Sequence, residues 1–221
     1  MLHLTRTARV GLSLVLLLLP GARAARAARA ARAAQSGVSD SLTYNLSPAS
    51  RLDVRTGKAG LLGFAGHEHL IHARAFSGQV VLYPDRPVAS HADISIITDS
   101  LEVLTPPDTA EIRKVTASMR SDVLDVAQYP EIQFVSRTVE RGGGDTLRIL
   151  GALTMHGRTR EVPVVVHVVI APGRDTLRAI ASFTVKQSDF GIRPYRGGPG
   201  GTVRVADAVT FDIDAVALRR P

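Results

Sequence analysis

Residues 119–134 read MRSDVLDVAQYPEIQF, and this stretch changes from a helical to an extended pattern at Tyr129-Pro130. Proline cannot continue a helix, and it pushes the residue before it toward extended backbone geometry. We therefore predict that a helix ends by about Gln128 and that a strand opens at Glu131-Ile132-Gln133-Phe134.

Upstream of this boundary, the sequence carries a signature for the beginning of the helix. Asp108 can act as an N-cap, and Glu111 stands three residues later, in the capping-box position. Apolar residues then recur at helical spacing, at Ile112, Val115, Met119, Val123 and Val126. The pattern predicts one helix over residues 108–126.

Most of the chain on either side of this helix alternates between apolar and polar residues with a period of two, which is typical of strands. Counted from Leu42, the pattern predicts eight to nine strands. Short turn-like connections such as Pro84–Pro87 and Arg141–Asp145 join them. Short returns connect antiparallel neighbours, because parallel pairs need long crossovers.

A sheet of about eight strands with one apolar face either closes into a barrel or folds into two packed layers. Closure at eight strands leaves an interior that holds side chains or one small ligand. An outer-membrane barrel, with its apolar face outward, is disfavoured because such barrels carry aromatic girdles. This chain has no tryptophan and only ten tyrosines and phenylalanines. An internal helix is also unexpected in such a barrel.

Two further stretches follow the helix-to-strand boundary: GALTMHGRTREV at residues 151–162 and FTVKQSDFGI at residues 183–192. Together the three stretches resemble the YceI-like family of secreted bacterial proteins, also called polyisoprenoid-binding proteins. The resemblance runs from about Tyr44 to Ala217. It implies an all-β domain over residues 42–218, an antiparallel lipocalin-like barrel with one helix, which holds an apolar lipid and has neither enzyme chemistry nor a cofactor.

The resemblance points to the inward-facing apolar row as the lipid-binding surface. We expect this row to comprise Phe76, Val80, Leu82, Ile94, Ile96, Ile132, Phe134, Leu153, Met155, Phe183, Phe211 and Ile213. Periodicity alone favours plain core for the same residues, because apolar strand faces bury themselves with or without a ligand. Only the resemblance argues for a cavity, so a merely structural barrel stays an alternative.

A histidine cluster at His67, His69 and His72 supports a competing interpretation as a periplasmic metal-binding protein. Residues two apart lie on the same side of a strand, so His67 and His69 could chelate one metal ion. In a regular strand His72 lies on the opposite face. A full ligand set is therefore missing, and the histidines could instead contact a polar head group.

Arg193 and Arg196 precede the glycine-rich segment 197–201. Two arginines beside such a loop could hold the phosphate of a lipid head group. The simpler interpretation is a hairpin loop with solvated charges, because no helix N-terminus follows.

The N-terminus has the features of a secretory signal peptide and an Ala/Arg-rich leader over residues 1–34. Basic residues precede an apolar stretch, VGLSLVLLLL at residues 10–19, which is too short to span a bilayer. Small-x-small sequences place cleavage between residues 24 and 34. We therefore expect a periplasmic or secreted protein of the bacterial envelope that does not span the membrane.

The leader also accounts for the basic charge. It holds six of the 27 lysines and arginines and no acidic residue, so 21 basic residues remain against 20 acidic ones. This near balance removes the case for a nucleic-acid partner. The chain has no cysteine and hence no disulfide framework or thiol nucleophile. No recognisable catalytic motif is present, and the sequence leaves the oligomeric state open, a dimer included.

Overall fold

The structure is a computed structural model that describes residues 41–59, 68–105, 109–197 and 203–220. The chain divides into two units, Met1–Ser39 and Asp40–Pro221, and all the described residues belong to the second. The expected leader over residues 1–34, the expected N-cap Asp108 and the segment 198–201 lie outside the described residues.

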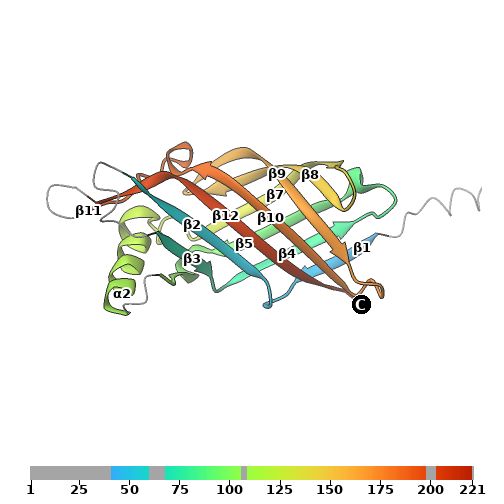
Figure 1. The fold of residues 1–221 in the computed structure, drawn as a ribbon, viewed down its shortest axis with the longest axis horizontal. Coiled ribbons are helices and arrows are strands. Elements are labelled where there is room, and N and C mark those ends of the chain that lie inside the picture. The colour runs from blue at the N-terminus through green and yellow to red at the C-terminus, as the bar shows by residue number, and fades with distance from the viewer. Residues whose placement is uncertain (1–40, 60–67, 106–108, 198–202, 221) are drawn as a thin grey trace, which may run out of the picture. The chain divides into compact units, whose positions relative to one another are not determined.

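The described part of the chain is built mainly from β-strands (Figure 1). The strands are β1 (Leu42–Leu46), β2 (Arg51–Ala59), β3 (His69–Ala73), β4 (Phe76–Leu82), β5 (His91–Ile97), β6 (Leu101–Val103), β7 (Glu131–Arg141), β8 (Thr146–Met155), β9 (Arg158–Ile170), β10 (Thr176–Lys186), β11 (Arg196–Gly197) and β12 (Val203–Arg219). The helical segments are α2 (Thr109–Ser118), the π-helical turn η4 (Met119–Val123) and the short 3₁₀ turns η2 (Pro87–Ala89), η3 (Thr98–Ser100) and η5 (Gln187–Phe190).

Antiparallel pairing closes the sheet into an eight-stranded barrel, as predicted. Neighbouring strands follow the order β1-β4-β5-β7-β8-β9-β10-β12, and β12 pairs back onto β1. Closure leaves no strand edge exposed around this ring, which removes a common route to aggregation.

At one end of the barrel, three short strands extend the wall. β12 is long enough to pair with β1 near its C-terminus and with β2 further back. After β12, the strands β2, β3 and β6 pair in that order, just as β1, β4 and β5 pair in that order in the barrel. Each of the three therefore continues one barrel strand beyond a bend. The eight ring strands, these three extensions and the two-residue strand β11, which pairs with β12, together make the twelve strands.

A helix completes the wall where the sheet stops. Within the described ranges, β6 pairs with β3 and with no strand on its other side. Side chains of the helical segment form hydrogen bonds with backbone groups of this edge. Arg120 donates to the carbonyl oxygen of Leu101 from Nε (3.3 Å) and Nη2 (3.1 Å). The amide of Val103 donates to Thr116 Oγ1 at 3.4 Å.

The helix-to-strand boundary lies where the sequence predicted it. The helical segment runs through α2 and η4 and ends at Val123, and β7 opens at Glu131, directly after Pro130. The turn between them is closed by the amides of Gln128 and Tyr129, which donate to the carbonyl oxygen of Asp125 at 3.0 and 2.9 Å.

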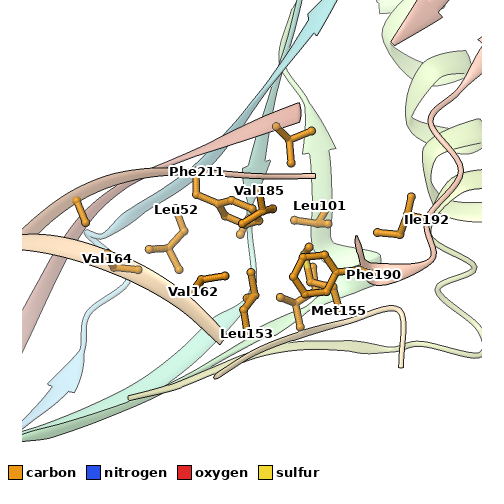
Figure 2. Close-up of a cluster of buried hydrophobic side chains, with 14 of the residues drawn as sticks. Leu52, Leu101, Leu153, Met155, Val162, Val164, Val185, Phe190, Ile192 and Phe211 are labelled. Atoms are coloured by element: carbon orange, nitrogen blue, oxygen red, sulfur yellow. The ribbon is translucent and has the colours of Figure 1, made fainter. Parts of the chain in front are cut away.

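The apolar face of the sheet points into the barrel. Along β9, Val162, Val164 and Val166 are buried, whereas Pro163 and Val165 between them are exposed. This alternation is the one expected when a strand turns a single face toward a core. Most of the buried side chains form one cluster around the middle of the barrel and its helix end (Figure 2).

The three stretches that carried the family resemblance meet near the helix end. The ring of Tyr129 lies 4.1 Å from that of His156, centroid to centroid, so His156 is half-buried in its hairpin turn. Gly157 (φ +68°) packs beneath the Tyr129 ring, and Gly191 (φ +75°) packs beneath the guanidinium of Arg158. Both glycines combine left-handed backbone with a close contact, which a side chain there would strain.

Candidate functional site

The barrel interior holds two cavities, one at each end. The wide cavity has a volume of about 480 Å³ and lies at the helix end. The narrow cavity has a volume of about 140 Å³ and lies between the barrel strands proper. Five side chains line both, so the two cavities are adjacent. These shared residues, the collar, are Leu52, Ile96, Ile132, Phe211 and Ile213.

The structure places eleven of the twelve predicted pocket residues on a cavity wall. Six of them line the narrow cavity alone: Val80, Leu82, Ile94, Phe134, Leu153 and Phe183. Four belong to the collar: Ile96, Ile132, Phe211 and Ile213. Met155 lines the wide cavity. Phe76 lines neither and packs half-buried against the main core cluster, at the start of β4 just after the bend from β3. Whether the eleven contact a lipid stays a prediction.

Aromatic rings shape the narrow cavity. Phe183 of β10 and Phe211 of β12 face each other across the strand pair and stack with centroids 5.0 Å apart and an angle of 3° between planes. Phe134 lies against Gly151, where an added Cβ would stand 2.2 Å from the ring. The glycine therefore makes room for a ring that lines the cavity.

A second buried cluster borders the narrow cavity, and three of its residues line the cavity wall. Its members are Leu42, Tyr44, Leu82, Leu177 and Ala217. Tyr44 is fully buried, and its hydroxyl donates to the carbonyl oxygen of Arg174 at 3.2 Å. Burial raises the pKa of Tyr44, because the phenolate would lose its hydration. The phenol thus stays neutral within this apolar cluster.

The wide cavity has a wall that the predicted set did not include. The helical segment contributes the apolar side chains of Val115, Met119 and Val123, and Leu124 directly after it also lines the cavity. Three of these stand at the helical spacing that predicted the segment. The signal for this wall was therefore present in the sequence, but spacing does not say which cavity a helix will face.

Polar side chains reach the wide cavity near the helix end. His69 Nδ1 lies 2.7 Å from the carbonyl oxygen of Thr105, which can only accept, so Nδ1 carries the proton. Gln187 is buried, and its Nε2 donates to the carbonyl oxygen of Ala206 at 2.8 Å. Both side chains are held by the backbone while they line the cavity.

Two cationic side chains also line the wide cavity, from opposite elements. Lys114 comes from α2 and Arg204 from β12, and both side chains are exposed to solvent. A residue that is exposed and also lines a cavity marks an opening. The wide cavity therefore opens beside Lys114 and Arg204, and by the same criterion the exposed His91 marks an opening of the narrow cavity.

The predicted head-group residues Arg193 and Arg196 do not line either cavity. Both are exposed on the segment around β11, where Arg196 pairs across the strands with Arg204. Tyr195, between them, does line the wide cavity, and its ring lies over Gly197. A contact of either arginine with a ligand stays a prediction.

The histidines of the metal hypothesis are separated in the structure. His67 lies outside the described residues. His69 lines the wide cavity, whereas His72 contacts Asp53 through Nδ1 and Oδ1 at 2.6 Å. Across the parts of the chain that the structure describes, no group of three or more His, Cys, Asp or Glu side chains could hold a metal ion. Because His67 is not described, a metal site at His67 and His69 stays a prediction.

The outer face of the same strands carries paired charges. Asp212 accepts from Arg55 Nη2 at 3.0 Å, and Asp214 accepts from Arg178 Nε at 2.7 Å. The hydrogen bond from Arg55 holds the pKa of Asp212 below its usual 3.8, and that from Arg178 does the same for the pKa of Asp214. The barrel thus separates a charged exterior from an apolar interior along single strands.

No helix among the described residues is both long and apolar enough to cross a bilayer.

A family model described as "YceI-like domain" matches residues 51–217, from the beginning of β2 nearly to the end of β12. Sequence relatives include a UPF0312 protein of Pseudomonas syringae pv. tomato, 36% identical over 134 residues, or 58% of this chain and 64% of the relative. Protein YceI of Escherichia coli is 28% identical over 130 residues, or 55% and 64%. The chain thus spans somewhat less than two thirds of the length of these relatives.

Solved structures share the fold. BcnA of Burkholderia cenocepacia superposes with a TM-score of 0.60 at 22% identity, over 76% of this chain and 95% of its own. A polyisoprenoid binding domain from Saccharophagus degradans, implicated in plant cell wall breakdown, gives a TM-score of 0.60 at 14% identity, over 81% and 99%.

Proposed function

This chain belongs to the YceI-like family, and from that premise we propose that it binds an apolar lipid of the isoprenoid type inside its barrel. The observation that carries the proposal is the unfilled apolar interior. Two adjacent cavities lie inside the barrel, with a collar of apolar side chains between them, and the narrow one borders the buried cluster around Tyr44.

The shape of the interior suits a single long tail. The narrow cavity is reached through the collar, and its wall consists almost entirely of aliphatic and phenyl side chains from the barrel strands. A tail in it would exchange water for apolar contacts along its whole length. Each five-carbon isoprene unit gains about 4 kcal/mol gross by area transfer. Ordering the flexible tail and immobilising the ligand reduce this gain.

The relatives support the same class of ligand. One neighbour of the same fold is described as a polyisoprenoid binding domain. We propose that this chain acts likewise by sequestration or carriage, without catalysis. The predicted leader over residues 1–34 supports a location in the periplasm or outside the cell.

The test is extraction of the protein as the cell makes it. The full chain is expressed with its leader in a Gram-negative host, and the processed protein is purified without detergent. After denaturation, the released contents are identified by mass spectrometry, and metals are measured by elemental analysis. We expect one apolar lipid per barrel. Stoichiometric zinc or copper without lipid would contradict the proposal and favour the histidine hypothesis.

A reloading experiment makes the test independent of the host. Delipidated protein is titrated with geranylgeraniol, an uncharged isoprenoid alcohol, and binding is followed by calorimetry. We expect saturable binding with a negative heat-capacity change, the mark of buried apolar surface. Absence of saturable binding would refute the proposed function.

A further inference from the structure

Resting on the proposed function, we infer that the helical segment formed by α2 and η4 is a lid over the wide cavity. It opens to let a lipid tail pass and moves about the chain at residues 124–128. The lid supplies one side of the cavity with the apolar side chains of Val115, Met119 and Val123. Lys114 of α2 is exposed and lines the same cavity, so an opening lies beside the helix. Figure 1 shows α2 at this end of the barrel, outside the strands.

Side chains join the lid to β6, whereas backbone ladders join the barrel strands to one another. Arg120 donates to the carbonyl oxygen of Leu101 from Nε and Nη2, and its Nε lies 3.5 Å from Asp99 Oδ1. At the other end of β6, Thr116 Oγ1 accepts from the amide of Val103 at 3.4 Å, which is long for a hydrogen bond. These bonds can break without disturbing the ladder of the sheet.

Little buried apolar surface holds the lid in place. Among the side chains of α2 and η4 that the structure describes, only that of Met119 is buried. Val115 and Val123 are half-buried and line the cavity. β9, by comparison, buries both Val162 and Val164 in the core. Moving the lid therefore separates few packed groups, and segments with few buried contacts are the ones that open at low free energy.

The hinge follows η4, where the backbone departs from a regular α-helix. η4 is a π-helical turn, and the amide of Leu124 donates to the carbonyl oxygen of Met119 at 2.9 Å. Such turns are rare and often lie at functional sites. Asp125 then has a left-handed φ of +45°, which is uncommon for a residue with a side chain. Beyond it, the ring of Tyr129 packs against that of His156. This contact fixes the chain behind the hinge, so the motion is confined to residues before Tyr129.

The experiment uses the fact that the chain has no cysteine, so two introduced thiols can be bridged specifically. Asp99→Cys/Arg120→Cys removes the ion pair that latches the lid, and bismaleimidoethane then joins the two partly exposed positions. Each form is loaded with geranylgeraniol, and release into excess phosphatidylcholine vesicles is followed by mass spectrometry. The unbridged variant should release the alcohol about fivefold faster than the wild type, because one hydrogen-bonded anchor is lost. The bridged variant should release it about tenfold more slowly, because the lid cannot open.

Arg178→Cys/Asp214→Cys is the matched control. It replaces another partly exposed arginine–aspartate pair, which joins β10 to β12 on the outer face of the barrel. The same reagent can bridge it, and neither residue lines a cavity. Release should therefore match that of the wild type in both the unbridged and the bridged form.

A second measurement needs no lipid. Amide hydrogen exchange of the lipid-free protein should be faster than in the wild type in α2 and η4 of the unbridged variant and slower there in the bridged one, with β8 and β9 unchanged. Arg120→Ala should behave as the unbridged variant does in both measurements. It tests the latch without thiols if the cysteine pair impairs folding, which circular dichroism checks.

The outcomes separate the lid from the proposed function. Release that bridging leaves unchanged, or that slows equally in the bridged control, would overturn the lid and leave lipid binding intact. Exchange that rises equally in the lid and in the barrel strands would also contradict a lid that opens by itself. Failure of the wild type to bind geranylgeraniol would overturn the proposed function, whereas a change of exchange confined to α2 and η4 would still show that this segment opens as a unit.

Discussion

The narrow and wide ends of the barrel interior differ in what builds their walls. The narrow cavity is enclosed by the hydrogen-bonded barrel strands and borders the buried cluster around Tyr44. The wide cavity is enclosed partly by the extension β2-β3-β6 and partly by α2 and η4, and its lining includes charged side chains. The lining of the narrow cavity is therefore almost wholly apolar, whereas that of the wide cavity is mixed.

The backbone explains why the wall changes from one end to the other. β12 pairs with β10 without interruption, but its register with β2 shifts between Val205 and Val209. Bulges of this kind bend a strand and increase its twist. β6 ends in an edge whose polar groups bond to Arg120 and Thr116 rather than to a strand. The helical segment is thus the part of the wall that is not joined to its neighbour by backbone hydrogen bonds between strands.

We expect the largest effect on the free energy of unfolding from the rings that pack near the two cavities. Phe190 is 1% exposed and lies in the core cluster behind the wide cavity, near Met155 (Figure 2). Phe190→Ala should lower the free energy of unfolding by about 3–5 kcal/mol, as expected for a buried ring. Phe183→Ala should lower the free energy of unfolding by less, because the Phe183 ring borders the narrow cavity and makes fewer packing contacts. Urea unfolding of both variants gives the comparison, and equal losses would contradict it.

Filling the narrow cavity should weaken the binding of an isoprenoid tail. Ala181 is buried on β10 and lines the narrow cavity, whereas Ile180 beside it points outward. Ala181→Leu should destabilise the fold by about 1–3 kcal/mol through overpacking. It should also weaken geranylgeraniol binding by more than about tenfold. Ile180→Leu is the control on the outer face and should leave calorimetric binding unchanged. A normal affinity in Ala181→Leu would show that the tail lies elsewhere.

Removing an anchor of the helix should affect the wide end alone. Arg120→Ala deletes the two hydrogen bonds to the carbonyl oxygen of Leu101, and we expect a loss of about 1 kcal/mol. Amide hydrogen exchange should rise in α2 and η4 but not in β8 or β9. Arg113→Ala, on the exposed side of the same helix, should change neither the free energy of unfolding nor the amide exchange rates. Faster exchange throughout the barrel would mean that the two ends unfold as one unit.

The smallest effect concerns the ion pairs outside the barrel. Arg55 lowers the pKa of Asp212 below its usual 3.8, so the folded state favours the carboxylate. The resulting stability is present above pH 3.8 and is lost as the pH falls through the lowered value. Asp212→Asn should flatten the acid side of a stability curve from pH 6 to pH 2. Ser182→Ala removes a weaker partner of Asp212 and should flatten it less. A steeper acid limb in Asp212→Asn would contradict this assignment.

Much of this architecture was predictable because strand alternation is local. Ile132 and Phe134 alternate along β7, the pattern predicted that both face inward, and both line the barrel interior. The boundary at Tyr129-Pro130 was equally clear, since proline acts on its own neighbours. The wall contributed by Val115 and Met119 was not predicted, because helical spacing identifies an apolar stripe but not the surface that it covers.

The charged residues of the wide cavity show the same limit. A contact of Arg193 or Arg196 with a ligand stays a prediction, and the sequence did not indicate that Lys114 and Arg204 would line the cavity. These two residues are 90 positions apart in the chain and meet only when the helix and β12 reach the same end of the barrel.

The sequence by itself determined the strands, the helix, the inward apolar face and the family, because those depend on residues a few positions apart. Only the tertiary structure decided that the interior contains two adjacent cavities and which distant residues line them. The physical reason is that a cavity and its mouth are set by how distant elements pack, and packing depends on three-dimensional contacts that no local pattern records.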